Sequence, residues 1–128
     1  MTDTLTQAAR DAQRRAYAPY SRFAVGAALE ADDGRIFAGC NVENASYGLT
    51  MCAERVALAT AVAAGAQRFR RAVVVTDTDP PAAPCGACRQ VLAEFGPDLV
   101  IDAVGTTSRR RWTMPELLPD AFAREQLA

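Results

Sequence analysis

The chain has 128 residues, enough to bury the core of one domain and too few for two, so we expect a single domain over residues 1–128. Half of the residues are hydrophobic, 23% are charged and the net charge is -1, which argues against disorder and against strong attraction to nucleic acid or anionic lipid. All fourteen basic residues are arginine, which excludes a Ser-His-Asp triad, an HExxH zinc site and a Schiff-base lysine.

The order of the predicted elements indicates an α/β fold with a mixed sheet. Three breaks have clear signals: Pro19 ends the first helix, Asp33-Gly34 marks a hairpin turn, and Gly65 closes the second helix. In chain order we expect helix 5–17, strand 23–31, strand 35–42, loop 43–50, helix 52–64, strand 71–76, loop 77–84, helix 85–95, strand 99–104, strand 109–113, and short helical pieces over 115–118 and 121–127.

Three of the four cysteines stand where a polar loop becomes a helix. Cys85 and Cys88 are three residues apart on one helical turn, the usual spacing for two thiolates on one metal. Cys52 opens the preceding helix, and the positive end of a helix stabilises a thiolate. If the two helix starts converge, three thiolates can bind one Zn²⁺ and leave its fourth position open, which is the pattern of a catalytic site.

Glu54 gives this cysteine pattern a possible chemistry. Two positions after Cys52, its carboxyl group can lean over the metal without binding it and transfer protons. The alternatives are an ordinary solvated glutamate at Glu54, a redox pair formed by Cys85 and Cys88, and a structural zinc site with Cys40 as fourth ligand. Without a metal role, Cys40 is expected to be a small buried thiol.

Further motifs surround these residues in a fixed order. They are YSRFAVGAA at 20–28, GCNVEN at 39–44, Pro-Cys-x-x-Cys at 84–88 and LLP at 117–119. Together they resemble the small zinc-dependent cytidine deaminases of pyrimidine salvage. The resemblance implies a three-layer α-β-α fold with a mixed five-stranded sheet, one zinc ion per subunit, and a homotetramer with sites at its subunit interfaces. It also implies hydrolytic deamination of cytidine and 2′-deoxycytidine to uridine and 2′-deoxyuridine, with release of ammonia.

The resemblance also implies a role for individual residues. Cys52, Cys85 and Cys88 would bind zinc, and Glu54 would transfer protons. The residues implied to contact the nucleoside are Phe23 against the pyrimidine, Asn41 and Glu43 at the ribose, the backbone of Ala53, Tyr47 at the pocket edge, and Phe122 closing a neighbouring subunit's pocket. Asparagine and glutamate suit hydroxyl groups, although taken alone these two residues also fit an ordinary strand end and loop.

Three thiolates would leave a zinc site with a net negative charge, which weakens zinc as a Lewis acid. We expect Arg55, three residues after Cys52, to donate to a thiolate sulfur and withdraw some of that charge. Arg89 and Gln90 are further candidates for this role. The alternative for Arg55 is an ordinary surface charge on a helix.

Deaminases that act on polynucleotides usually have histidine where this chain has Cys52, so the resemblance favours a free nucleoside over a nucleic acid. The basic clusters at 68–71 and 109–111 are interpreted as solvated or interface charge. No stretch reaches the roughly 20 apolar residues of a membrane helix, and residues 1–15 carry no apolar signal core, so we expect a cytoplasmic protein without a membrane partner. A blasticidin-S-type deaminase, with the same metal and Glu54 but no ribose contacts, is the nearest alternative.

Overall fold

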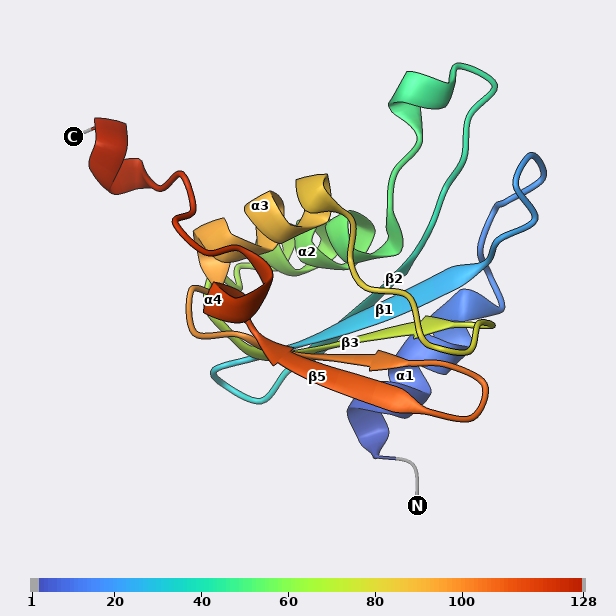
Figure 1. Ribbon diagram of the computed structural model, residues 1–128, viewed down its shortest axis with the longest axis horizontal. Helices are drawn as coiled ribbons and strands as arrows, with labels where there is room; N and C mark the ends of the chain where they lie inside the picture. The colour runs from blue at the N-terminus through green and yellow to red at the C-terminus, as the bar shows by residue number, and fades with distance from the viewer. Residues whose placement is uncertain (1–2, 128) are drawn as a thin grey trace.

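The computed structural model describes residues 3–127, which fold around one five-stranded sheet (Figure 1). The elements are α1 (Thr4–Gln13), β1 (Val25–Ala31), β2 (Ile36–Cys40), the 3₁₀ helix η1 (Tyr47–Leu49), α2 (Ala53–Ala63), β3 (Phe69–Thr76), α3 (Gly86–Phe95), β4 (Val100–Val104), β5 (Arg109–Thr113), α4 (Met114–Leu117) and the 3₁₀ helix η2 (Arg124–Leu127). The strand order is β2-β1-β3-β4-β5. Only β3 and β4 are parallel, so the expected mixed sheet is confirmed.

Helices cover both faces of the sheet and make the expected three layers (Figure 1). Side chains alternate along a strand, so β3 contributes to two separate cores. Ala72 and Val74 pack with α2 and α3, whereas Val73 and Val75 pack with α1. Burial on both faces explains the run of apolar residues from Ala72 to Val75 in this strand. Within residues 3–127, no helix has the length and apolar character needed to cross a membrane.

Two glycines let helices lie directly on the sheet. A Cβ atom on Gly26 of β1 would collide with the carbonyl oxygen of Ala9 in α1. A Cβ atom on Gly39 of β2 would collide with the backbone nitrogen of Ala57 in α2. The close approach at Gly39 sets the distance between α2 and the sheet. It therefore also sets how far the N-terminal end of α2, with Cys52 as its cap, lies from the sheet.

The predicted elements are present, and the differences lie at their ends. The first helix ends at Gln13, four residues earlier than expected, because the following segment pairs with the chain beyond β2. The backbone N–H of Tyr17 donates to the Asn41 carbonyl at 3.0 Å, and Glu43 N–H donates to the Tyr17 carbonyl at 2.9 Å. The loop over 43–50 contains the short helix η1, and the last helical piece is the 3₁₀ helix η2.

Most arginines of the basic clusters are exposed, as expected, and three of them also bond one buried carboxylate. Asp102 of β4 is 1% exposed. The helix α1 packs against β1, β2 and β3, and β4 is the next strand along the sheet. Its carboxylate accepts hydrogen bonds from Arg71 at 3.0 Å, Arg109 at 3.4 Å and Arg111 at 2.7 Å. Burial opposes its ionisation, but the bonds from Arg111 and Arg71 outweigh burial and hold the pKa of Asp102 below its ordinary value. Sequence analysis missed this because Asp102 stands inside an apolar strand.

Candidate active site

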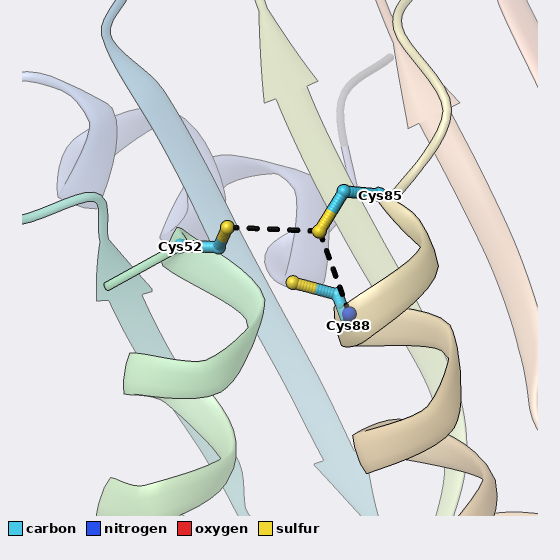
Figure 2. A group of neighbouring side chains, drawn as sticks. All are labelled: Cys52, Cys85 and Cys88. Carbon is cyan, nitrogen blue, oxygen red and sulfur yellow. Dashed lines mark hydrogen bonds between the residues drawn. The ribbon is translucent and has the colours of Figure 1, made fainter. Parts of the chain in front are cut away.

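Three thiols meet at the N-terminal ends of two neighbouring helices. Cys52 and Cys85 have extended backbones and cap α2 and α3, and Cys88 lies in the first turn of α3. Figure 2 shows the three side chains converging between the two helix starts. The sulfur atoms of Cys52 and Cys85 are 3.8 Å apart, and the three sulfurs all lie within 4.8 Å of one another. Residues 33 positions apart in the sequence therefore form one cluster of ligands.

The cluster fits zinc. Two thiolates bound to one tetrahedral zinc lie about 3.8 Å apart, given Zn–S bonds of about 2.3 Å, and Cys52 and Cys85 already have this separation. Within residues 3–127 these three cysteines are the only such group of ligands, and Cys40, at the end of β2, is not part of it. The structural four-cysteine alternative is therefore wrong. Three protein ligands leave one coordination position for water, as in a catalytic zinc site.

The surroundings of Cys52 favour its thiolate form. Hydrogen bonds from Cys88 and Arg55 lower the pKa of the Cys52 thiol to about 5. The bond that Cys88 makes to Cys52, together with burial, raises the pKa of Cys88 itself. Nη2 of Arg55 lies 3.6 Å from the Cys52 sulfur, and Nε of Arg55 is buried without an acceptor among the residues that the structure describes. A guanidinium with spare donors beside sulfur suits a negatively charged metal centre.

Glu54 lies in the first turn of α2, two residues after Cys52, and is only 6% exposed. Burial raises the pKa of its carboxyl group to about 6, because the charged form loses its hydration. A carboxyl group with a pKa this close to neutral can both accept and donate a proton under ordinary conditions. Its position and its protonation behaviour therefore both suit proton transfer.

A cavity of about 190 Å³ opens beside the thiols and Glu54. Among the residues with sequence-predicted roles, it is lined by Phe23, Asn41, Cys52, Ala53, Glu54 and Cys85. Sequence analysis gave no role to Thr76, Ala82 or Ala83, which complete one wall. Ala82 and Ala83 carry no chemical signal of their own, and only their place just before the Pro-Cys-x-x-Cys motif could have drawn attention to them.

Asn41 is 7% exposed and holds the start of β1 in place. Its Oδ1 accepts from the Val25 N–H at 2.9 Å, and its Nδ2 donates to the Phe23 carbonyl at 2.7 Å. A primary amide has two N–H groups and two acceptor lone pairs, so each end of the Asn41 side chain keeps capacity for one more bond. The same residue can therefore shape the cavity wall and bind a polar group within the cavity.

Glu43 lies in a second hollow, of about 380 Å³, with Tyr47, Tyr20 and Ser21. Thr50 lines both hollows, so they adjoin. The carboxylate of Glu43 accepts from the N–H groups of Tyr20 at 3.0 Å and Ser21 at 3.1 Å, and also from the Ser21 hydroxyl. The bond from the Ser21 hydroxyl contributes most to lowering the pKa of Glu43.

Arg89, Gln90 and Phe122 line neither of these two hollows. Phe122 is 59% exposed in the segment after α4, where its carbonyl accepts from Gln90 Nε2 at 2.8 Å. Arg89 donates to the Pro84 carbonyl at 2.8 Å and to the Leu117 carbonyl at 2.9 Å. Arg89 and Gln90 therefore bind main-chain carbonyls, and the structure shows no bond from either residue to the sulfurs.

Residues 1–103 match the family model described as the cytidine and deoxycytidylate deaminase zinc-binding region. The chain belongs to this family. It is 45% identical over 130 residues to a cytidine deaminase of Sporosarcina psychrophila, a match that covers 98% of this chain and 94% of that protein. It is 48% identical over 125 residues to a cytidine deaminase of Halalkalibacterium halodurans, covering 96% and 95% of the two chains.

Solved structures of the deaminase family share the fold. The crystal structure of cytidine deaminase from Burkholderia pseudomallei superposes with a TM-score of 0.90 at 53% identity, covering 95% of this chain and all of that one. Membership of a zinc-binding family agrees with the three converging sulfurs, which fit a zinc site.

Proposed function

We propose that this protein is a cytidine deaminase of pyrimidine salvage, which hydrolyses cytidine and 2′-deoxycytidine to uridine and 2′-deoxyuridine and releases ammonia. One observation carries the proposal: the buried carboxyl group of Glu54 and the sulfurs of Cys52 and Cys85 line a single cavity. The relatives that match nearly the whole chain support it. Zinc held by the three cysteines would supply a Lewis acid that lowers the pKa of a water molecule.

Glu54 transfers the protons of the reaction. Its carboxylate accepts a proton from water as the water oxygen attacks C4 of the pyrimidine, and it delivers that proton to N3. It then carries the remaining proton of the water to the exocyclic amine, which leaves as ammonia. The raised pKa of about 6 suits both steps, because general acid–base catalysis is most effective when the pKa is close to the working pH.

The two adjoining hollows suggest how a nucleoside is divided between them. The base occupies the cavity beside Phe23, close to the backbone of Ala53 at the start of α2, where helix N–H groups lack internal partners. Asn41 and Glu43 bind the ribose hydroxyls across the boundary that Thr50 forms. The carboxylate of Glu43 accepts hydrogen bonds, and the Asn41 amide both donates and accepts them.

Arg55 offsets the negative charge of three thiolates through its contact with Cys52. Arg89 supports the site indirectly, because its hydrogen bond to the Pro84 carbonyl fixes the position of the residue that precedes Cys85. Gln90 in turn holds the carbonyl of Phe122. A direct influence of Arg89 and Gln90 on the sulfurs stays a prediction.

We also propose a homotetramer with sites at its interfaces. Tyr47 and Phe122 support it, because these aromatic residues are 74% and 59% exposed on segments that project from the body of the fold (Figure 1). A neighbouring subunit would cover both residues. Tyr47 would lie at the edge of a substrate pocket, and Phe122 would close the pocket of a neighbouring subunit. Light scattering at the concentrations used for activity tests this assembly.

The remaining proposals concern the setting of the enzyme. One sheet that supplies both cores supports a single catalytic domain over residues 1–128. Four free thiols suit the reducing cytoplasm. Three arginines of the basic clusters, Arg71, Arg109 and Arg111, pair with Asp102, which leaves less unpaired basic surface for nucleic acid. We therefore propose a cytoplasmic enzyme that acts on free nucleosides.

The deciding experiment follows the ultraviolet absorbance of cytidine mixed with zinc-loaded protein, together with ammonia release. Conversion to uridine is the expected result. A panel with 2′-deoxycytidine, cytosine and blasticidin S then separates nucleoside deamination from other zinc-dependent deamination. Folded, zinc-bearing protein that leaves cytidine and 2′-deoxycytidine unchanged would contradict the proposal. The Cys85→Ser protein, which lacks one zinc ligand, is the matched inactive control.

A further inference from the structure

The loop over residues 77–84, between β3 and α3, forms one wall of the substrate cavity. Ala82 and Ala83 line the cavity, and the loop leads directly into Cys85 at the start of α3. The wall is made of small apolar side chains, so its distance from the base depends on where the backbone of the loop is held. The contacts that hold this loop therefore affect how tightly a substrate fits.

The turn between β4 and β5 holds the loop from the side. Asp79, at the centre of the loop, accepts hydrogen bonds from two hydroxyl groups of the turn: Thr107 Oγ1 at 2.6 Å and Ser108 Oγ at 2.8 Å. The N–H of Thr106 donates to the Thr78 carbonyl at 3.0 Å. Each oxygen of one carboxylate thus bonds a different residue of the turn, which fixes both the distance and the orientation of the loop.

Gly105 makes this contact possible. A Cβ atom at Gly105 would collide with the carbonyl oxygen of Thr78 and would lie 3.3 Å from Cα of Pro81. Pro81 is buried, and the next residue is Ala82 in the cavity wall. The turn therefore touches the loop at the residue beside the wall as well as at Asp79.

We infer that the β4–β5 turn, residues 105–108, is a positioning element for substrate affinity: through Asp79 it sets the place of the Ala82–Ala83 wall without touching the substrate. The inference rests on the proposed function. Ala82 and Ala83 carry no group that can follow the charge developing during the reaction, so displacing them should remove uniform binding. The expected signature is a higher KM with an unchanged kcat.

The test compares hydroxyl removal with hydroxyl retention at the same positions. The Thr107→Val/Ser108→Ala protein loses both donors and keeps similar side-chain shapes. We expect its KM for cytidine to rise about tenfold, with kcat within about twofold of wild type and full zinc content. The control is Thr107→Ser, which keeps a hydroxyl at position 107 and should retain the wild-type KM. Asp79→Ala should reproduce the tenfold rise, and the triple variant should show about the same rise, because all three residues act through one contact.

A second readout does not depend on catalysis. Hydrogen exchange at the amides of Ala82 and Ala83 should be faster in the Thr107→Val/Ser108→Ala protein, with exchange in α2 unchanged. If wild type fails to convert cytidine, the proposed function fails, and hydrogen exchange still decides whether the turn positions the wall. A wild-type KM together with unchanged exchange in the double variant would overturn the inference. A KM rise in the triple variant equal to the product of the rises in Asp79→Ala and the double variant would also overturn it.

Discussion

Arg55 donates from Nη2 to the sulfur of Cys52 across 3.6 Å, and the same nitrogen donates to the carbonyl of Thr50 at 3.3 Å. The second bond fixes the orientation of the guanidinium group beside the Cys52 sulfur. The positive charge therefore lies where it can stabilise the thiolate. The resulting hydrogen bond and attraction also hold the pKa of Arg55 above its ordinary value.

Replacing Arg55 should weaken the zinc site. In Arg55→Gln we expect the pKa of Cys52 to rise from about 5 and zinc affinity to fall about 10- to 100-fold. The ultraviolet absorbance of the thiolate in metal-free protein and competition with a chelator measure the two effects. Arg14→Gln, at an arginine just after α1 whose side chain is 74% exposed, is the control and should change neither. Wild-type zinc affinity in Arg55→Gln would show that the contact is incidental.

Glu54→Gln should separate catalysis from metal binding. Glutamine keeps the size of the side chain and cannot accept and release the proton, so kcat should fall by about 10²- to 10⁴-fold with little change in KM. Zinc content should stay at one ion per chain, because Glu54 is not among the three grouped ligands. Glu94→Gln, on the exposed side of α3, is the matched control and should retain full activity. Near-normal turnover by zinc-bearing Glu54→Gln would remove Glu54 from its proposed role.

The same substitution should stabilise the metal-free protein. Burial raises the pKa of Glu54 from 4.5 to about 6, so the folded state binds this proton more tightly than the unfolded chain. The associated stability is present below pH 4.5 and is lost as the pH rises through about 6. At about pH 8, Glu54→Gln should therefore exceed wild type by about 2 kcal/mol in free energy of unfolding, with no excess near pH 4. Urea unfolding in the presence of a chelator measures the difference, and an equal difference at both pH values would contradict the explanation.

Zinc should stabilise the fold by joining two helices. Its proposed ligands come from the starts of α2 and α3 (Figure 2), so removing zinc would leave the sulfurs without a shared partner. A chelator should lower the Tm of wild type, since a ligand that binds only the folded state stabilises it. Cys85→Ser should have a lower Tm from the outset and respond little to the chelator. Cys40→Ser should retain zinc and the chelator response, and loss of zinc from that variant would reopen the question of its ligand role.

Asp3 should contribute an acid-sensitive part of the stability. The backbone N–H of Thr6 donates to Asp3 at 2.7 Å and Arg71 donates at 2.9 Å, and these bonds lower the pKa of Asp3 from 3.8 to about 2. The stability is present above pH 3.8 and is lost as the pH falls through about 2. Asp3→Asn should therefore be less stable than wild type at about pH 6, with the gap closing towards pH 2. A gap that stays constant would indicate that the charge is irrelevant.

Sequence reasoning worked where a single residue dictates local structure. Gly65 has φ +95° just after α2, and Gly34 has φ +90° in the β1–β2 turn, as the helix-stop and hairpin signals predicted. The cysteine spacing also predicted a cluster of metal-ligating side chains. Contacts between distant segments could not be predicted this way. Nothing local to Tyr17 indicates its pairing beyond β2, and nothing local to Glu43 indicates that Tyr20 and Ser21 would fold onto its carboxylate.

The buried carboxylate of Asp102 on β4 restricts which substitutions this sequence can accept. Asp102 accepts hydrogen bonds from Arg71, Arg109 and Arg111, so replacing it alone would leave Arg109 and Arg111 without this acceptor, while Arg71 would keep its bond to Asp3. Replacing the arginines alone would leave a buried charge unpaired. Removing one member of the network should therefore lower stability more than replacing its charged residues together with apolar ones. The four positions form one unit for substitution, a constraint that does not depend on the reaction.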